Sequence, residues 1–257
     1  KYDHHTVRLW DAANGTITRR PIEPGDRASL YVYLDWMMSP SSNSAAGMVQ
    51  KHLILLQHYG TAYPVSPEEE ARFFRETPTK ELGEIFAAAI QSPVTRNGLD
   101  LDMIRQGSFF TNGGKKRVPG TSSYATPRSL MEFSVKMEQG KLVDAFSSRE
   151  IKRLLYMPQR RIRYASSPAL TSAAVYFKSG SLYKCKSETG FECKKYHGNV
   201  INMLNSVAII EAPAADRQLY YMVVVMSNVL RKNSAVAHQT LATRLHRILE
   251  KFHGPGK

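Results

Sequence analysis

The sequence is short of cysteine and of long hydrophobic runs. It has two cysteines in 257 residues, and its eight histidines form no His-x-x-x-His or Cys-x-x-Cys set. We therefore expect no metal centre and no cofactor held by such ligands. The longest apolar runs, such as Tyr220 to Met226, are far shorter than the roughly 20 residues of a membrane-spanning helix. No membrane span is expected.

Acidic residues are also in the minority, because 35 lysines and arginines face 22 aspartates and glutamates, a formal net charge of +13. Such a balance favours anionic partners, which include nucleic acid, acidic lipid headgroups and acidic cell-wall polymers. The charges are spread along the chain, with small clusters at Lys115–Arg117 and Arg160–Arg163. No known nucleic-acid-binding module accompanies them. We expect a solvated basic surface and no nucleic-acid partner, and a basic nucleic-acid-binding protein remains a rival interpretation.

The two cysteines lie on either side of a turn. Cys185 and Cys193 flank Glu188-Thr189-Gly190, a sequence that predicts a hairpin turn and brings two sulfur atoms within reach of one another. A disulfide favours an oxidising compartment. The alternative is a pair of free thiols in a reducing cytosol.

Helix signals dominate the first part of the chain, from about residue 29 to 164. Ser66-Pro67 predicts a helix start, which makes Glu68–Glu70 a first helical turn rather than a catalytic carboxylate cluster. Thr126-Pro127 predicts another helix that ends at Gly140, and Ser148 is expected to cap a third. The side chains expected to be buried on these two helices are Leu130, Phe133, Met137, Ile151, Leu154 and Leu155.

Strand signals dominate the rest, from about residue 165 to 257. Ala173–Phe177, Val207–Glu211 and Leu219–Met226 predict consecutive antiparallel strands. After Asn233 a closing helix is expected to pack on the sheet, through Leu241, Leu245, Ile248 and Phe252. The prediction is one α+β domain over residues 1–257, with a mainly helical subdomain followed by a sheet and its flanking helix.

Two short sequences carry chemistry. Ser41-Ser42-Asn43 comes first, and Lys178-Ser179-Gly180-Ser181 follows the strand that ends at Phe177. They resemble, in order, the Ser-x-Asn and Lys-Thr-Gly elements of class A β-lactamases and penicillin-binding proteins. The surrounding runs are similar to that family from about residue 23 to 252, including Glu23-Pro24-Gly25-Asp26, Thr126-Pro127 and the strands at Asn205–Ile210 and Tyr220–Asn228. The resemblance implies a two-subdomain β-lactamase/transpeptidase-like fold.

The resemblance also implies roles for these residues. Ser41 would relay a proton toward the leaving nitrogen, and Asn43 would bind the substrate amide and help to hold a catalytic lysine. Lys178 would supply positive charge, while the hydroxyls of Ser179 and Ser181 would hold a substrate carboxylate. Gly180 would let the substrate approach, and the Ser181 backbone N–H would form half of an oxyanion hole. The alternative is that the first motif is only a helix cap and the second only a strand exit.

The nucleophile of the family is not found. Its Ser-x-x-Lys lies on a helix before Ser-x-Asn, and residues 1–39 contain no match. Ser181-Leu182-Tyr183-Lys184 has the right letters, but on a strand residues i and i+3 point to opposite faces. We expect that a natural N-terminal segment, absent from this chain, completes the protein and supplies the partner strands that the sheet lacks. The alternative is a degenerate homologue.

The family's deacylating element is also missing. Glu-x-x-Leu-Asn does not occur between Asn43 and Thr126. The resemblance, without this element, implies a bacterial serine hydrolase, periplasmic or secreted, that forms an acyl-enzyme with β-lactams or D-Ala-D-Ala-like cell-wall peptides and releases it slowly. The alternative is a non-catalytic or sensor-type ligand-binding domain of the same fold.

Overall fold

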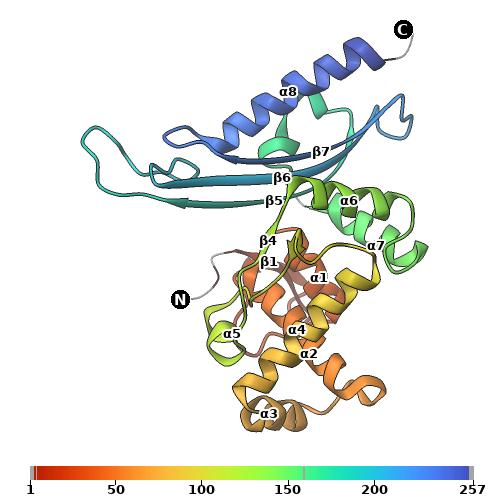
Figure 1. Ribbon diagram of the computed structural model, residues 1–257, viewed down its shortest axis with the longest axis vertical. Coiled ribbons are helices and arrows are strands. Elements are labelled where there is room, and N and C mark those ends of the chain that lie inside the picture. The colour runs from red at the N-terminus through yellow and green to blue at the C-terminus, as the bar shows by residue number, and fades with distance from the viewer. Residues whose placement is uncertain (1–2, 4, 159, 255–257) are drawn as a thin grey trace. The chain divides into compact units, whose positions relative to one another are not determined.

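Helices form most of the first half of the chain, as the capping signals predict (Figure 1). The computed structural model describes residues 3, 5–158 and 160–254. The chain divides into two units, Lys1–Ser129 and Leu130–Lys257. The expected single domain over residues 1–257 stays a prediction.

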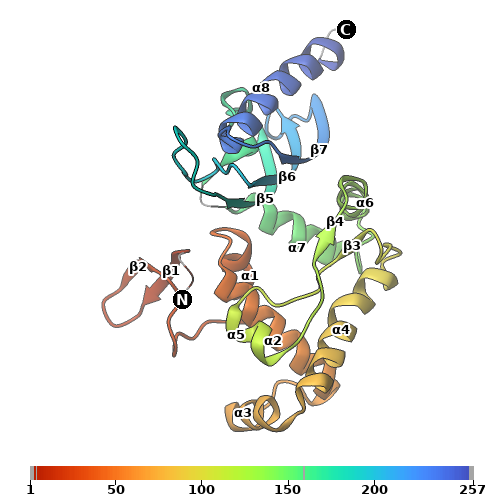
Figure 2. The same cartoon turned by 60° about the vertical axis from the view of Figure 1, so that its left-hand side comes forward.

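The first unit contains five helices and two small two-stranded antiparallel sheets within its described residues. Figure 2 shows the first hairpin, β1–β2, beside the N-terminus. The helices are α1 (Leu30–Met38), α2 (Asn43–Tyr59), α3 (Pro67–Glu76), α4 (Thr79–Arg96) and α5 (Asn112–Arg117), with a 3-10 turn at Gly60–Ala62, and the strands are β1 (Val7–Asp11), β2 (Thr16–Arg20), β3 (Ile104–Arg105) and β4 (Tyr124–Ala125).

Helix α2 organises the core of this unit. Its Ile54 and Leu55 are fully buried in a cluster with side chains of α3 and α4, among them Phe73 and Phe86. Its Ala45 and Val49 pack against a second cluster built around Trp36 of α1. Burying large apolar side chains contributes about 1.5–3 kcal/mol each. One long helix therefore joins both clusters of the unit.

The predicted start of α3 is confirmed. Ser66 is its N-cap and accepts a hydrogen bond from Glu69 N. Glu69 accepts from the Tyr59 hydroxyl over 2.7 Å and from Arg72, and Glu70 pairs with Lys51. These carboxylates are occupied by structural contacts.

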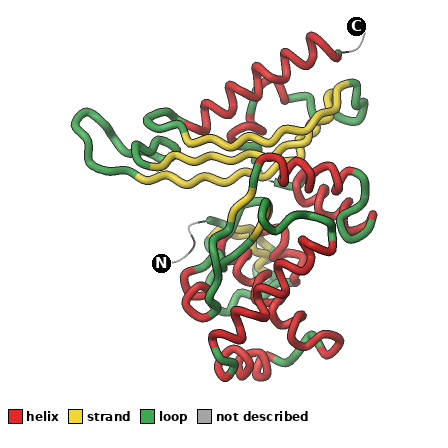
Figure 3. Tube along the Cα trace, viewed as in Figure 1, coloured by secondary structure: helices red, strands yellow, loops and turns green. Residues whose placement is uncertain are grey.

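The second unit is an antiparallel sheet in the order β5-β6-β7 with helices and 3-10 turns around it (Figure 3). Its helices are α6 (Pro127–Glu138), which begins at the boundary between the units, α7 (Ala145–Tyr156) and α8 (Ser234–His253). Its strands are β5 (Ala174–Lys184), β6 (Ile201–Ala212) and β7 (Leu219–Asn228), and its 3-10 turns are η2 (Arg163–Ser166) and η3 (Pro168–Leu170). This sheet and its closing helix confirm the predicted α+β class.

Strand β5 is longer than predicted. It pairs with β6 along its whole length, from Ala174 opposite Glu211 to Lys184 opposite Ile201. The expectation that Lys178-Ser179-Gly180-Ser181 follows the strand was wrong, because the partner strand continues and the motif lies inside the ladder. Val175 and Phe177 face the core with Ala208, Ile210 and Val223.

Two helix predictions were wrong in detail. The N-cap of α7 is Asp144, whose carboxylate accepts from Ser147 N over 2.6 Å. The predicted cap, Ser148, lies inside the helix, where its buried hydroxyl accepts from Leu142 N and donates to Leu142 O. On α6, Met137 is buried as predicted, while Leu130 and Phe133 are partly buried.

The expected inward stripe of α8 was wrong for three of its four residues. Leu241, Ile248 and Phe252 are 41%, 52% and 65% exposed. The helix instead faces the core through Ala242, Leu245 and Leu249, and through the buried His238 and His246. The prediction counted only apolar residues and therefore chose the wrong face of the helix, because two of its buried positions are histidines.

Candidate functional site

The Ser41-Ser42-Asn43 segment forms the turn from α1 into α2. Ser42 is the buried N-cap of α2, and its hydroxyl oxygen accepts from Ala45 N over 3.1 Å. The same hydroxyl donates to Asp3 Oδ2 over 2.7 Å, and Ser44 N donates to that oxygen over 2.9 Å. The capping interpretation therefore holds for Ser42.

Asp3 is held in its charged form at this helix start. Burial alone raises the pKa of Asp3, but hydrogen bonds from Ser44, Ser42 and His5 outweigh that effect and lower the pKa to about 2. A carboxylate at a helix N-terminus also meets the positive end of the helix dipole. Asp3 thus completes the cap of α2.

Ser41 and Asn43 flank the capping serine and are both partly exposed. Ser41 has a left-handed backbone, with φ of 63°, a conformation that is uncommon for residues other than glycine. The turn thereby sets the directions of the two side chains to which the sequence assigns roles.

A cavity of about 500 Å³ runs along α2 beside this turn. Ser44, Gly47 and Met48 line it from α2, opposite apolar side chains that include Phe74 and Phe109. Its charged neighbours make internal contacts: Lys51 pairs with Glu70, Asp26 pairs with Arg20, and Arg117 donates to the carbonyls of Phe74 and Thr77. The cavity therefore offers mainly apolar surface.

In the second unit, Arg163 gathers the serine hydroxyls of the Lys178–Ser181 motif. Its Nη1 donates to Ser179 Oγ over 2.8 Å and its Nη2 to Ser181 Oγ over 3.0 Å. Nη2 also donates to the Tyr196 hydroxyl over 3.3 Å, and the guanidinium lies 5.0 Å from the centroid of that ring. Among the described residues no carboxylate makes an ion pair with Arg163. A guanidinium whose hydrogen-bond partners are neutral hydroxyls favours an anionic ligand.

Lys178 lies on the opposite face of β5 from Ser179 and Ser181, because side chains alternate along a strand. Its ammonium donates to Ser179 O over 3.2 Å. Burial and the nearby Arg163 guanidinium lower the pKa of Lys178 to about 8. Gly180 is exposed, and a Cβ built there would meet nothing within 4 Å. The strand is open at this point.

A buried histidine of α8 contacts the strands next to the serine pair. Ser179 stands opposite Ser206 in the β5–β6 ladder. His238 Nδ1 lies 3.1 Å from Ser206 Oγ, and its Nε2 lies 2.8 Å from Ser227 Oγ. Burial and the charge of Arg163 lower the pKa of His238, so the ring is neutral near pH 7. It supports the strands without adding charge.

The structure groups the predicted residues into two sets. Ser41 and Asn43 lie in the first unit, and Lys178 to Ser181 lie together on β5 in the second. The residues that sequence reasoning missed are Arg163 and Tyr196. In the sequence Arg163 belongs to the basic cluster Arg160–Arg163, and a short 3-10 turn has no periodic signal that could single it out.

The predicted disulfide is present. Cys185 and Cys193 are bonded, with their Cα atoms 6.0 Å apart. Within residues 3, 5–158 and 160–254, no group of three or more metal-binding side chains occurs. No helix in that part of the chain is long and apolar enough to cross a membrane.

Comparison with solved structures identifies the architecture. A β-lactamase from Sphaerobacter thermophilus DSM 20745 matches with a TM-score of 0.52 at 13% identity, over 92% of this chain and 67% of that one. The chain has the β-lactamase fold. The resemblance read from the two motifs is thus confirmed at the level of the fold. No family model matches the sequence, and no curated protein matches it.

Two structures of PBP-A are also similar. One matches with a TM-score of 0.49 at 14% identity, over 90% of this chain and 64% of that chain. The other, an acyl-enzyme complex of a PBP-A mutant with penicillin G, has a TM-score of 0.46 at 14% identity, over 90% and 65%. The chain therefore spans about two thirds of the length of these β-lactamase-fold proteins.

Proposed function

We propose that the natural protein is a serine hydrolase that forms an acyl-enzyme with β-lactams or D-Ala-D-Ala-like peptides. The observation that carries the proposal is the bonding of Arg163 to the buried Ser179 and the exposed Ser181 on strand β5 of a β-lactamase fold. Both substrate classes present a carboxylate next to the amide that is attacked.

The hydrogen bonds at this site suit a carboxylate. Each serine hydroxyl already accepts from Arg163, so its own O–H proton remains available to donate. A hydroxyl that accepts from a cation is polarised and donates more strongly. Two such hydroxyls side by side can meet the two oxygens of one carboxylate, and the positive charges of Arg163 and Lys178 add long-range attraction.

The nucleophile is assigned to no residue of this chain. We place it on a Ser-x-x-Lys segment of the natural protein, with Ser41 as proton relay and Asn43 as amide ligand. The apolar cavity along α2 supports this arrangement, because a further apolar segment packed there would remove the partly exposed Phe74 and Met48 from water.

Slow release is expected from the composition of residues 103–120, which contain no aspartate or glutamate. Deacylation needs a base beside the attacking water, and a positioned base contributes about 10²–10⁴-fold in rate. Within this segment Thr111 closely approaches Gly47 of α2, where an added Cβ would lie 2.9 Å from its methyl carbon. A threonine there cannot act as that base at neutral pH.

The disulfide supports a periplasmic or secreted location in a bacterium, since such bonds persist in oxidising compartments. The second candidate function is a non-catalytic ligand-binding domain of the same fold. It would keep the anion site of Arg163, Ser179 and Ser181 and lack acyl transfer.

Intact-protein mass spectrometry tests the proposal. The natural protein with its complete N-terminus should carry a covalent adduct minutes after benzylpenicillin is added, with slow steady-state hydrolysis. The 257-residue chain is the matched control and should form no adduct. Rapid turnover without an adduct would show that a deacylating base exists elsewhere. Neither adduct nor turnover in the complete protein would reject the hydrolase and leave the binding domain.

A further inference from the structure

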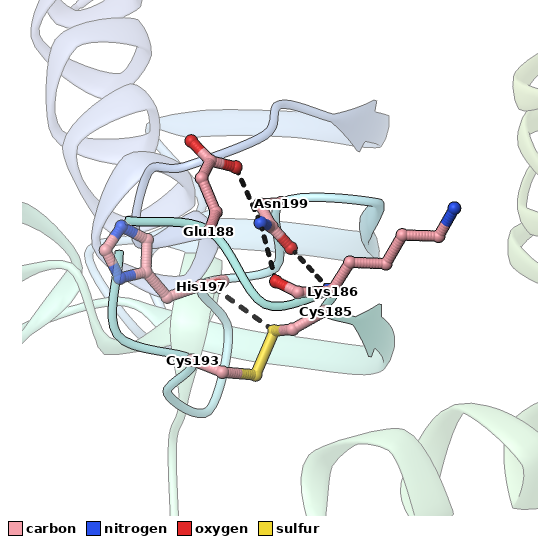
Figure 4. The surroundings of a disulfide bond; sticks show 6 residues. All are labelled: Cys185, Lys186, Glu188, Cys193, His197 and Asn199. Carbon is pink, nitrogen blue, oxygen red and sulfur yellow. Dashed lines mark hydrogen bonds between the residues drawn. A yellow bond between two sulfur atoms is a disulfide. The ribbon is translucent and has the colours of Figure 1, made fainter. Parts of the chain in front are cut away.

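The connection from β5 to β6, residues 185–200, is a cross-linked loop rather than a tight hairpin. Cys185 and Cys193 close its outer part by their disulfide. The buried Asn199 fixes its return: Asn199 Oδ1 accepts from Lys186 N over 2.9 Å, and its Nδ2 donates to Lys186 O over 3.0 Å (Figure 4). The outgoing and returning strands of the loop are thus tied at two levels.

The loop is also tied to the segment that leads into α8. Asn199 Nδ2 donates to Glu188 over 2.7 Å, and Glu188 accepts two hydrogen bonds from Arg231 at 2.9 and 2.8 Å. Arg231 N donates to Gly198 O over 2.9 Å, and His197 Nε2 lies 2.7 Å from Arg231 O. The loop is therefore held from two sides.

These ties fix the backbone of Tyr196. Its carbonyl accepts from Ser234 N over 3.0 Å, at the first residue of α8. Tyr196 has a left-handed backbone with φ of 66°, which for a bulky residue persists only where the surroundings impose it. The ring is consequently presented in one direction, toward Arg163.

We propose that Tyr196 is a positioning residue, which the disulfide-closed loop uses to hold Arg163 against Ser179 and Ser181, and that it thereby sets the affinity of this site for anions. The proposal rests on the anion site of the proposed function. Arg163 has no carboxylate partner among the described residues, so its direction depends on neutral contacts. Of these, Tyr196 contributes both its ring and its hydroxyl, and the Nη2 atom that donates to Tyr196 also donates to Ser181.

The electrostatics of the pair agree with this geometry. Burial raises the pKa of the Tyr196 hydroxyl, but hydrogen bonding to Arg163 and the charges of Arg163 and Lys195 outweigh it and lower the pKa. The pKa of Tyr196 therefore depends on its contact with Arg163. A phenol that is merely packed would not respond to removal of the arginine.

Binding of inorganic sulfate to the 257-residue chain tests the proposal, followed by NMR titration. Tyr196→Leu should weaken binding by at least about fivefold, because a cation–π contact and a hydrogen bond are both lost. Tyr196→Phe keeps the ring and should lose less. Tyr183→Leu, at an exposed tyrosine of β5, is the matched control and should bind like the parent protein.

Two measurements distinguish a positioning role of Tyr196 from a role in folding, and from a failure of the anion site as a whole. In Arg163→Ala the pKa of Tyr196, measured on ¹³C-labelled tyrosine, should rise. Sulfate binding in Tyr196→Leu within twofold of the parent, with Arg163→Ala strongly impaired, would overturn the positioning role alone. Unchanged binding in Arg163→Ala would overturn the anion site, and with it the carboxylate assignment of the proposed function.

Reduction of the disulfide tests whether the loop acts through Tyr196. If the loop acts through Tyr196, a mild reductant should weaken sulfate binding in the parent chain and have no further effect in Tyr196→Leu, because the two changes remove the same contact. Equal weakening in both proteins would show that the loop acts by another route. Unchanged binding after reduction would remove the disulfide from the mechanism.

Discussion

Lys152 Nζ donates to Glu211 Oε1 over 2.8 Å and thereby joins helix α7 to strand β6. The same ammonium donates to Glu138 Oε2 of α6 over 3.0 Å, and Arg217 also donates to Glu211 over 2.8 Å. Glu211 is only 5% exposed. These two carboxylates and their cationic partners form a partly buried ion-pair cluster, which holds α6 and α7 to the sheet.

Lys152→Met should destabilise the protein by about 3 kcal/mol, because Glu138 loses its ammonium partner and the buried Glu211 keeps only Arg217. Denaturant unfolding measures the change. Arg153→Met is the control: its pair with Glu150 is exposed, and such pairs contribute about 0–1 kcal/mol. Similar losses in the two variants would contradict a special role for the buried cluster.

Sulfate affinity should fall as the pH rises through about 8. The pKa of Lys178 is lowered to about 8 by burial and Arg163, so the ammonium is charged below that pH and neutral above it. Lys178→Met should bind more weakly at pH 7 and lose this pH dependence. Sulfate titrations at pH 7 and pH 9 measure this change in affinity. If Lys178→Met shows the same fall in affinity between the two pH values, another group is responsible for it.

His238 should make the folded state sensitive to mild acid. Its pKa is lowered by burial and by Arg163, so the unfolded chain binds the proton more readily. Stability is then present above the unfolded value near 6.5 and declines as the pH falls below it. In His238→Gln the loss of unfolding free energy between pH 7.5 and 5.5 should be smaller. The part due to His52, whose pKa is also lowered, should remain. An identical slope would contradict the assignment.

The cap of α2 gives a further prediction. Ser42→Ala should cost about 1 kcal/mol of stability, since an N-cap hydroxyl is lost together with its bond to Asp3. Ser44→Ala, two residues later in the same helix, removes no capping hydroxyl and should change stability little. Thermal unfolding of the two variants provides the comparison. Because the pKa of Asp3 is about 2, the contribution of Asp3 should persist to about pH 4 and disappear as the pH falls through about 2.

Local sequence signals predicted the elements whose determinants are adjacent in the chain. Ser66-Pro67 gave the start of α3, and the two cysteines around a turn gave the disulfide, because capping and turn chemistry need only neighbouring residues. The two motif segments, together with the similar runs between about residues 23 and 252, were enough to predict the fold. Ser148 misled the capping prediction, because the helix begins four residues earlier at Asp144, whose carboxylate accepts from Ser147 N.

Arg163 and the inward face of α8 depend on contacts between distant residues. Arg163 meets Ser179 and Ser181 only after a chain reversal through η2 and η3, and Tyr196 reaches it from a third segment. His238 and His246 are buried because Ser206, Ser227 and Tyr221 satisfy their ring nitrogens. The sequence of α8 alone does not indicate these partners. A prediction based only on its apolar residues therefore assigned the wrong face of the helix to the core.

The unbroken ladder between β5 and β6 determines which changes of length the protein can tolerate. Inserting or deleting one residue between Ala174 and Phe177 would exchange the faces of Lys178 and Ser179, so that the serines would leave Arg163. The same change at residues 187–192 lies outside the paired register. Relatives of this chain should therefore vary in the length of the loop and keep the strand before the motif constant.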